Sequence, residues 1–239
     1  MASDLTIVTT CLNEEDNIES FIFRAVEAAR KNSVDIDLVV VDDGSTDETA
    51  EKLKDLEVIY SMLKVVTNSP NKGIVESWRV ALAEVNTDLI CLIDSDLQNA
   101  PEDIYELYGA YQGSKGLDEK RFVQGYRVPE KTDLRAYISK GFNRLLNLVF
   151  GMSLKDNKSG FLLGEKVALQ AALVHKYSYY YFQSFISVSL VKNGYVIVEK
   201  PTIFYERTRG SSFIAGIPIK EMCRCFIDLA KAAVEFGGR

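Results

Sequence analysis

The first half of the chain alternates between short apolar runs rich in β-branched residues and longer segments whose apolar residues recur at helical spacing. The apolar runs are predicted as strands, over Leu5–Thr10, Asp37–Val41, Leu63–Asn68 and Leu89–Ile93. Strands that alternate with helices pair in one parallel sheet through right-handed crossovers. The sequence therefore predicts an α/β fold with a mostly parallel sheet flanked by helices.

Acidic side chains follow two of these predicted strands. Asp42 and Asp43 end the second strand, and the fourth runs into Asp94, Asp96 and Gln98. Ligands of α/β proteins collect at the carboxyl ends of the strands. Carboxylate and amide oxygens are the ligands of a hard cation such as Mg²⁺, which also binds the phosphates of a substrate. The alternatives are a helix cap at Asp96 and a solvated acidic turn at the second strand.

Several classes of protein are disfavoured by what the chain contains. The turn after the first strand lacks the G-x-G-x-x-G of a dinucleotide-binding dehydrogenase. A net charge of −6 argues against a nucleic-acid partner. The four cysteines lack zinc-site spacing and read as reduced thiols, and no signal-peptide or membrane-spanning pattern is present. We therefore expect a cytoplasmic protein, in which His175 is a surface residue without a role.

In the second half of the chain, predicted strands and helices alternate less regularly. A strand at Phe122–Tyr126 ends at Arg127, and a helix over Tyr137–Phe150 follows. Two further strands, Tyr195–Lys200 and Thr202–Tyr205, are predicted on either side of Pro201. The chain closes with an amphipathic helix, which either packs on its own domain or lies on a membrane surface.

The motifs NEED, VVDDGSTDET, NKG and DSDLQ, in this order, resemble those of inverting GT-A glycosyltransferases of family 2. The later motifs FVQGYR, LRAYISKGFN, DNKSGFLL, YYYFQ and ERTRGSS resemble the dolichol-phosphate mannose synthase branch, which loads a sugar onto a polyprenyl phosphate. The resemblance implies one Rossmann-like GT-A domain over residues 1–239. Within it, 1–111 would bind nucleotide, 112–213 would bind acceptor, and 214–239 would form the amphipathic helix.

The resemblance also implies roles for individual residues. It places a Mg²⁺ or Mn²⁺ ion on Asp94, Asp96 and Gln98, against the diphosphate of a GDP- or UDP-hexose. The donor would be bound by Thr10, Leu12, Glu14, Asp42, Asp43, Asp94, Asp156 and Ser159. The acceptor phosphate would be bound by Arg127, Arg135, Ser139 and Arg207. The catalytic residues would be Asp96, Arg127 and Arg207.

Four positions depart from the family pattern. Thr10 and Leu12 stand where proline and tyrosine are usual, Phe185 stands where an acid is common, and Phe213 replaces a lysine.

The chemistry of the acceptor separates the remaining hypotheses. A sugar or other hydroxyl acceptor requires a general base, for which Asp156 is a candidate. A lipid phosphate is already anionic near neutral pH and requires none. We predict transfer to a polyprenyl phosphate at the cytoplasmic membrane face. Transfer to a hydroxyl group and a non-catalytic nucleotide-sugar-binding subunit are the alternatives. A phosphatase of the haloacid dehalogenase type is disfavoured, because its DxD motif normally ends the first strand.

Overall fold

The computed structural model describes residues 3–113, 120–128, 134–205 and 219–237, without the side chains of 134–136 and 219–222. In this part of the chain, seven strands form one sheet in the order β3-β2-β1-β4-β6-β5-β7. The strands are β1 (Leu5–Cys11), β2 (Ile36–Asp42), β3 (Leu63–Thr67), β4 (Leu89–Leu92), β5 (Arg121–Val128), β6 (Leu162–Glu165) and β7 (Val196–Ile203). Within this sheet β6 is antiparallel to its neighbours β4 and β5, and the other pairs are parallel. The predicted mostly parallel α/β sheet is confirmed.

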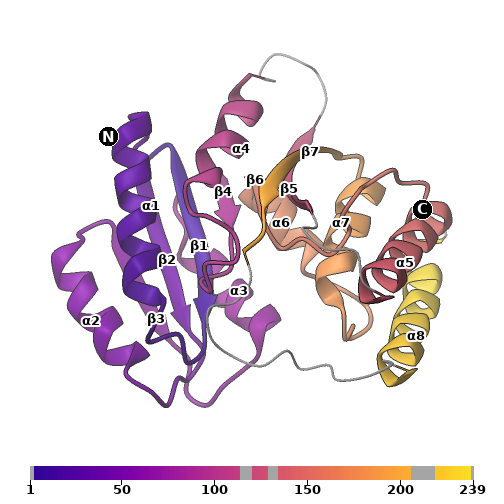
Figure 1. The fold of residues 1–239 in the computed structure, drawn as a ribbon, viewed down its shortest axis with the longest axis horizontal. Coiled ribbons are helices and arrows are strands. Elements are labelled where there is room, and N and C mark those ends of the chain that lie inside the picture. Colours follow the sequence, from indigo (N-terminus) through magenta and orange to yellow (C-terminus); the bar gives the residue numbers. More distant parts are fainter. Residues whose placement is uncertain (1–2, 114–119, 129–133, 206–218, 238–239) are drawn as a thin grey trace.

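Helices cover both faces of the sheet (Figure 1). They are α1 (Ile18–Asn32), α2 (Thr49–Ile59), α3 (Ile74–Glu84), α4 (Asp103–Gln112), α5 (Leu134–Phe150), α6 (Lys166–Ala172), α7 (Phe182–Lys192) and α8 (Ile219–Phe236). Successive side chains of a strand point to opposite faces. Ile7 of β1 accordingly packs in the cluster that includes α1, α2 and α4, whereas Val8 packs in the one that includes α3, α6 and α7.

A third apolar cluster lies beside the sheet. It joins α5, α7 and α8 through residues such as Phe142, Phe185 and Phe236, all of them buried. Figure 1 shows α5 and α8 side by side at the right of the view, whereas α1 and α2 lie at the left. Burial of this apolar area is the main force that holds α8 on the domain. No helix in the described ranges is long and apolar enough to span a membrane.

One prediction about the strands of the second half was wrong. The strands expected on either side of Pro201 are one continuous strand, β7, in which Pro201 pairs with Tyr126 of β5. Among the described strands β7 lies at the edge of the sheet, where a proline removes no hydrogen bond that the ladder needs. The short helix α6 was not predicted.

His175 is buried rather than on the surface, which also contradicts the prediction. Its side chain is 6% exposed and lies 3.5 Å from the carboxylate of Glu235 in α8, with its ring edge-on to Tyr179. Burial lowers the pKa of His175. Glu235 also accepts hydrogen bonds from the Tyr179 hydroxyl (2.7 Å) and the Lys176 N–H (3.0 Å). His175 therefore belongs to the contacts that fix the end of α8.

Candidate functional site

A cleft of about 500 Å³ lies where the predicted site residues gather, beyond the carboxyl ends of β1, β2 and β4. Its wall continues onto β5, the loop before β6 and the start of α7. The predicted residues that line it are Thr10, Leu12, Glu14, Asp43, Asp94, Asp96, Gln98, Arg127 and Ser159. The fold therefore brings together donor, metal and acceptor candidates from distant parts of the sequence.

The turn after β4 carries the predicted metal ligands. The Ser95 hydroxyl donates to the Thr10 carbonyl of β1 (3.1 Å), which fixes the turn against the neighbouring strand. The Gln98 N–H donates to Asp96 Oδ1 (3.1 Å), and Leu97 between them has a φ of +60°. This left-handed conformation is uncommon for a residue other than glycine, and such conformations concentrate at functional sites.

The donor set of this turn suits a hard divalent cation. The Asp94 and Asp96 carboxylates both line the cleft, one on either side of Ser95. The described residues contain no group of three or more His, Cys, Asp or Glu side chains that could hold a metal alone. Mg²⁺ typically binds through one or two carboxylates together with substrate phosphates. The residues therefore fit an ion that is held jointly by the protein and a phosphate-bearing ligand.

Asp43 shapes the cleft wall beside α3. Its Oδ1 accepts hydrogen bonds from Asn68 Nδ2 and the Lys72 N–H (both 2.9 Å), and its Oδ2 accepts one from the Gly73 N–H (2.8 Å). Burial alone would raise its pKa, but these hydrogen bonds hold the pKa of Asp43 below its usual value. An ionised Asp43 thus fixes the loop that leads into α3.

The neighbouring Asp42 is placed differently. It is buried at the end of β2, is not part of the cleft lining, and accepts a hydrogen bond from the Ser45 N–H through Oδ1 (3.0 Å). Its Oδ2 has no hydrogen-bond partner among the described residues.

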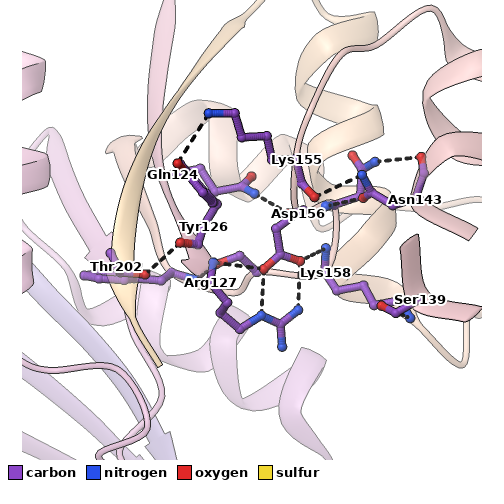
Figure 2. Close-up of polar contacts among 12 residues, drawn as sticks. Gln124, Tyr126, Arg127, Ser139, Asn143, Lys155, Asp156, Lys158 and Thr202 are labelled. Carbon is purple, nitrogen blue, oxygen red and sulfur yellow. Dashed lines mark hydrogen bonds and ion pairs between the residues drawn. The ribbon is translucent and has the colours of Figure 1, made fainter. Parts of the chain in front are cut away.

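Arg127 enters the cleft from β5 and is held by Asp156 (Figure 2). The guanidinium Nε and Nη2 donate to the two carboxylate oxygens at 2.6 and 2.8 Å, which is the bidentate arrangement. Although burial opposes it, the ion pair lowers the pKa of Asp156. A carboxylate in such a pair is a poor general base, because a base works best with a pKa near the working pH.

Side chains from α5 and β7 hold the loop that contains Asp156. Asn143 and Asn147 of α5 each donate to the Leu154 carbonyl (both 2.7 Å), and Asn143 Oδ1 accepts from the Asn157 N–H (2.7 Å). Glu199 of β7 accepts from the Lys155 N–H (2.8 Å). The position of Asp156, and hence of Arg127, is set by elements that are distant in the sequence.

Several residues of the cleft lining were missed by the sequence analysis, among them Lys158 and Gln183. Lys158 lies within the DNKSG motif, between two residues that were selected, so its position was the available signal. Gln183 lies against Gly160, where an added Cβ would sit 2.8 Å from the Gln183 Nε2. Glycine is therefore the residue that leaves room for this amide at the cleft.

Some predicted residues lie elsewhere. Asp156 and Ser139 lie behind the cleft lining and contact Arg127 and Lys158, respectively. Arg207 and Phe213 lie outside the described residues, and so does the side chain of Arg135 in α5. Phe185 is buried and stacks on Tyr179 at 4.3 Å between ring centroids. This position, where the family commonly has an acid, therefore supplies no acidic group to the site.

A second hollow, here called the α8 groove, adjoins the cleft and has a volume of about 530 Å³. Gly73 and Ile74 line both. The groove runs between the start of α3, the loop before α7, and α8. Its apolar wall includes Ile74, Val75, Phe182 and Ile227, and its cationic side chains are Lys72, Arg224 and Lys231.

Comparisons with known proteins agree with this architecture. A dolichol-phosphate mannosyltransferase of Pyrococcus furiosus is 29% identical over 95% of this chain and 64% of its own length. An undecaprenyl-phosphate 4-deoxy-4-formamido-L-arabinose transferase of Pseudomonas fluorescens is 31% identical over 64% of this chain and 44% of its own length. The chain thus spans less than two thirds of either relative.

A solved structure shares the fold. It is glucosyl-3-phosphoglycerate synthase from Mycobacterium tuberculosis in complex with Mn²⁺, uridine diphosphate and phosphoglyceric acid. The match has a TM-score of 0.67 at 20% identity and covers 98% of this chain and 78% of the other. This likeness supports the GT-A fold.

The family model for glycosyl transferase family 2 matches residues 6–171, which include β1 from its second residue, β2 to β4 and the loop with Asp156. The chain belongs to glycosyl transferase family 2.

Proposed function

We propose that this enzyme transfers a hexose, with inversion and with a divalent metal ion, from a nucleoside-diphosphate sugar to a polyprenyl phosphate. The observation that carries the proposal is one cleft in which Asp94 and Asp96 end β4 and Arg127 projects from β5. Carboxylates for a metal and an arginine for phosphate oxygens suit a reaction in which a nucleoside diphosphate departs.

On the donor side, we propose that Asp94, Asp96 and Gln98 hold Mg²⁺ or Mn²⁺, which when bound would stabilise the charge of the leaving diphosphate. Thr10, Leu12, Glu14 and Asp43 would form the nucleotide pocket, within residues 1–111, with Asp42 buried behind it. Support comes from the lining of the cleft and from the Mn²⁺ and uridine diphosphate bound in the structural neighbour.

On the acceptor side, two observations favour a lipid phosphate. The first listed relatives are named for dolichol-phosphate and undecaprenyl-phosphate transfer. Asp156, the candidate base for a hydroxyl acceptor, forms an ion pair with Arg127. We propose that Arg127, Arg135 and Arg207 bind the phosphate from residues 112–213, with Ser159 beside the donor sugar.

The hydrocarbon chain of such an acceptor would need an apolar path and a membrane nearby. The α8 groove leads from the cleft past Ile74 and Phe182 to Ile227. On the outer faces of α5 and α8, Leu148 and Val234 are 81% and 68% exposed. Cationic side chains next to apolar ones suit an anionic membrane surface. We propose that residues 214–239 contact the cytoplasmic membrane face in this way.

A transfer assay tests the proposal. The purified chain is incubated with UDP-glucose or GDP-mannose, with undecaprenyl or dolichyl phosphate in detergent, and with Mg²⁺, Mn²⁺ or EDTA. We expect one donor to yield a polyprenyl-phosphate hexose of inverted anomeric configuration, measured by NMR, with no product in EDTA. Product with a free polyprenol or a sugar acceptor, but none with any lipid phosphate, would contradict the proposed acceptor.

A further inference from the structure

We propose that Lys158 binds the phosphate of the acceptor and makes the enzyme select an anionic acceptor over a neutral one. The inference rests on the proposed function and adds to it a residue that determines specificity. It starts from the surroundings of the Lys158 ammonium in Figure 2.

The Lys158 ammonium is enclosed by neutral groups. It donates to the Ser139 hydroxyl of α5 at 3.3 Å, and it lies 5.4 Å from the centroid of the Phe142 ring and 6.0 Å from that of the Tyr181 ring. The side chain is half-buried and lines the cleft. The ammonium is thus held at one place at the edge of the site.

The nearest available carboxylate does not neutralise this ammonium. Asp156 accepts the Lys158 backbone N–H (3.2 Å), but its two oxygens bind the Arg127 guanidinium. No ion pair joins the Lys158 ammonium to a carboxylate of the described residues. Burial lowers the pKa of Lys158, and so does the nearby charge of Arg127, whereas Cys225 and the Asp156 carboxylate raise it.

An ammonium that is partly desolvated without a counter-charge is costly unless an anion reaches it. Arg127 and Lys158 both line the cleft, and the Asp156 carboxylate behind them is paired with Arg127. An acceptor phosphate would supply a counter-charge to the Lys158 ammonium, whereas a neutral hydroxyl would leave the ammonium desolvated without one. This difference is the basis of the proposed selectivity.

The position of Lys158 assigns it to the acceptor rather than to the donor diphosphate. The donor diphosphate belongs with the carboxylates at the end of β4, whereas Lys158 is braced by α5 and by the loop before α7. The same loop supplies Tyr180 to the α8 groove, and the first residue of α7 supplies Phe182. Ser139, predicted to contact phosphate itself, would then act as a positioning residue for Lys158.

The chain offers a matched set of variants. Lys158→Met removes the charge and Lys158→Arg keeps it. Ser139→Ala removes the hydroxyl that positions the ammonium. Lys155→Met is the control, because Lys155 lies in the same loop, is exposed, packs on Tyr126 and is not part of the cleft lining.

Two measurements are made on each variant. The first is kcat and KM for undecaprenyl phosphate and for undecaprenol. The second is the rise in Tm caused by inorganic phosphate. We expect Lys158→Met to lower kcat/KM for the phosphate acceptor by about 10-fold or more, chiefly through KM, and to lose the phosphate-induced rise in Tm. Its Tm without ligand should be unchanged or higher, because the desolvated charge is gone. Lys158→Arg should retain both properties, and Ser139→Ala should lose part of them.

The inference fails if Lys158→Met matches Lys155→Met both in kcat/KM and in the effect of phosphate on Tm. A wild-type enzyme that transfers to no lipid phosphate would contradict the proposed function instead. In that case the phosphate-induced rise in Tm still decides whether Lys158 binds an anion.

Discussion

The two sides of the cleft are built by different means. On the β1–β4 side, the carboxylate of Asp43 holds backbone N–H groups of the loop that follows β3. On the β5–β7 side, the guanidinium of Arg127 is positioned by Asp156, whose loop is in turn braced by α5 and β7. The first side depends on hydrogen bonds from backbone N–H groups to a carboxylate, and the second on an ion pair between two side chains, although the partners are a similar 29–30 residues apart along the chain on both sides.

This difference indicates a division of labour. We propose that the carboxylates serve a metal and a diphosphate on one side, and that the cations serve an anionic acceptor on the other. The side that depends on the Arg127–Asp156 ion pair should be more sensitive to the loss of one partner, because a buried charge is then left unpaired.

The largest expected effect is the loss of turnover when a carboxylate is removed from the turn after β4. Asp94→Asn removes a carboxylate that lines the cleft and should lower kcat for transfer by about 100-fold or more, as expected for the loss of charge stabilisation at a leaving group. The measurement is turnover at saturating metal. Asp88→Asn, an exposed change near the opposite end of β4, is the control and should retain full activity. Equal activity in both variants would remove Asp94 from the mechanism.

Arg127→Met should damage both activity and stability. It leaves the Asp156 carboxylate, which is 13% exposed, without its partner, and should lower the free energy of unfolding by roughly 2–3 kcal/mol. Urea unfolding measures this loss. The double variant Arg127→Met/Asp156→Asn should recover much of the stability but none of the activity. Recovery of activity would show that the pair is only structural.

Asp43→Asn should have a smaller effect on stability, about 1–2 kcal/mol, because one carboxylate oxygen becomes an NH₂ group beside N–H donors. Nucleotide affinity should fall with it, since the loop that leads into α3 lines the cleft. Calorimetry and urea unfolding test both effects against Asp55→Asn, an exposed change on α2. A loss of stability in Asp43→Asn as large as that in Arg127→Met would contradict the proposed contrast between the two sides.

The smallest expected effect is a dependence on pH. The pKa of Asp156 is lower in the folded protein than its ordinary value near 4. The stability that its ionisation contributes is therefore present above about pH 4 and is lost as the pH falls through the folded pKa. The difference in free energy of unfolding between the wild type and Arg127→Met/Asp156→Asn should shrink between pH 6 and pH 3. A constant difference would show that the ion pair does not control this contribution.

The sequence predicted the β1–β4 side well because its elements are local. Each strand is an apolar run, and its carboxylates follow directly at the edge where ligands bind. The other side was harder to predict. The strand β7 continues through Pro201 because it lies at the edge of the described sheet, and the His175 side chain is buried because α8 packs over it. Neither arrangement can be read from the local sequence. The position of Lys158 could not be interpreted before Asp156 was seen to be engaged by Arg127.

The most direct test of the central claim is the binding of nucleotide to the β4 turn. Thermal unfolding is measured with UDP, GDP, UDP-glucose and GDP-mannose, each with Mn²⁺ or with EDTA, for the wild type and Asp96→Ala. A ligand at 100 times its Kd should add about 2.7 kcal/mol to the free energy of unfolding. We predict a rise in Tm with one nucleotide in Mn²⁺, and no rise in EDTA or in Asp96→Ala. A rise of equal size in EDTA and in Asp96→Ala, or none with any nucleotide, would contradict a metal-dependent donor site at this cleft.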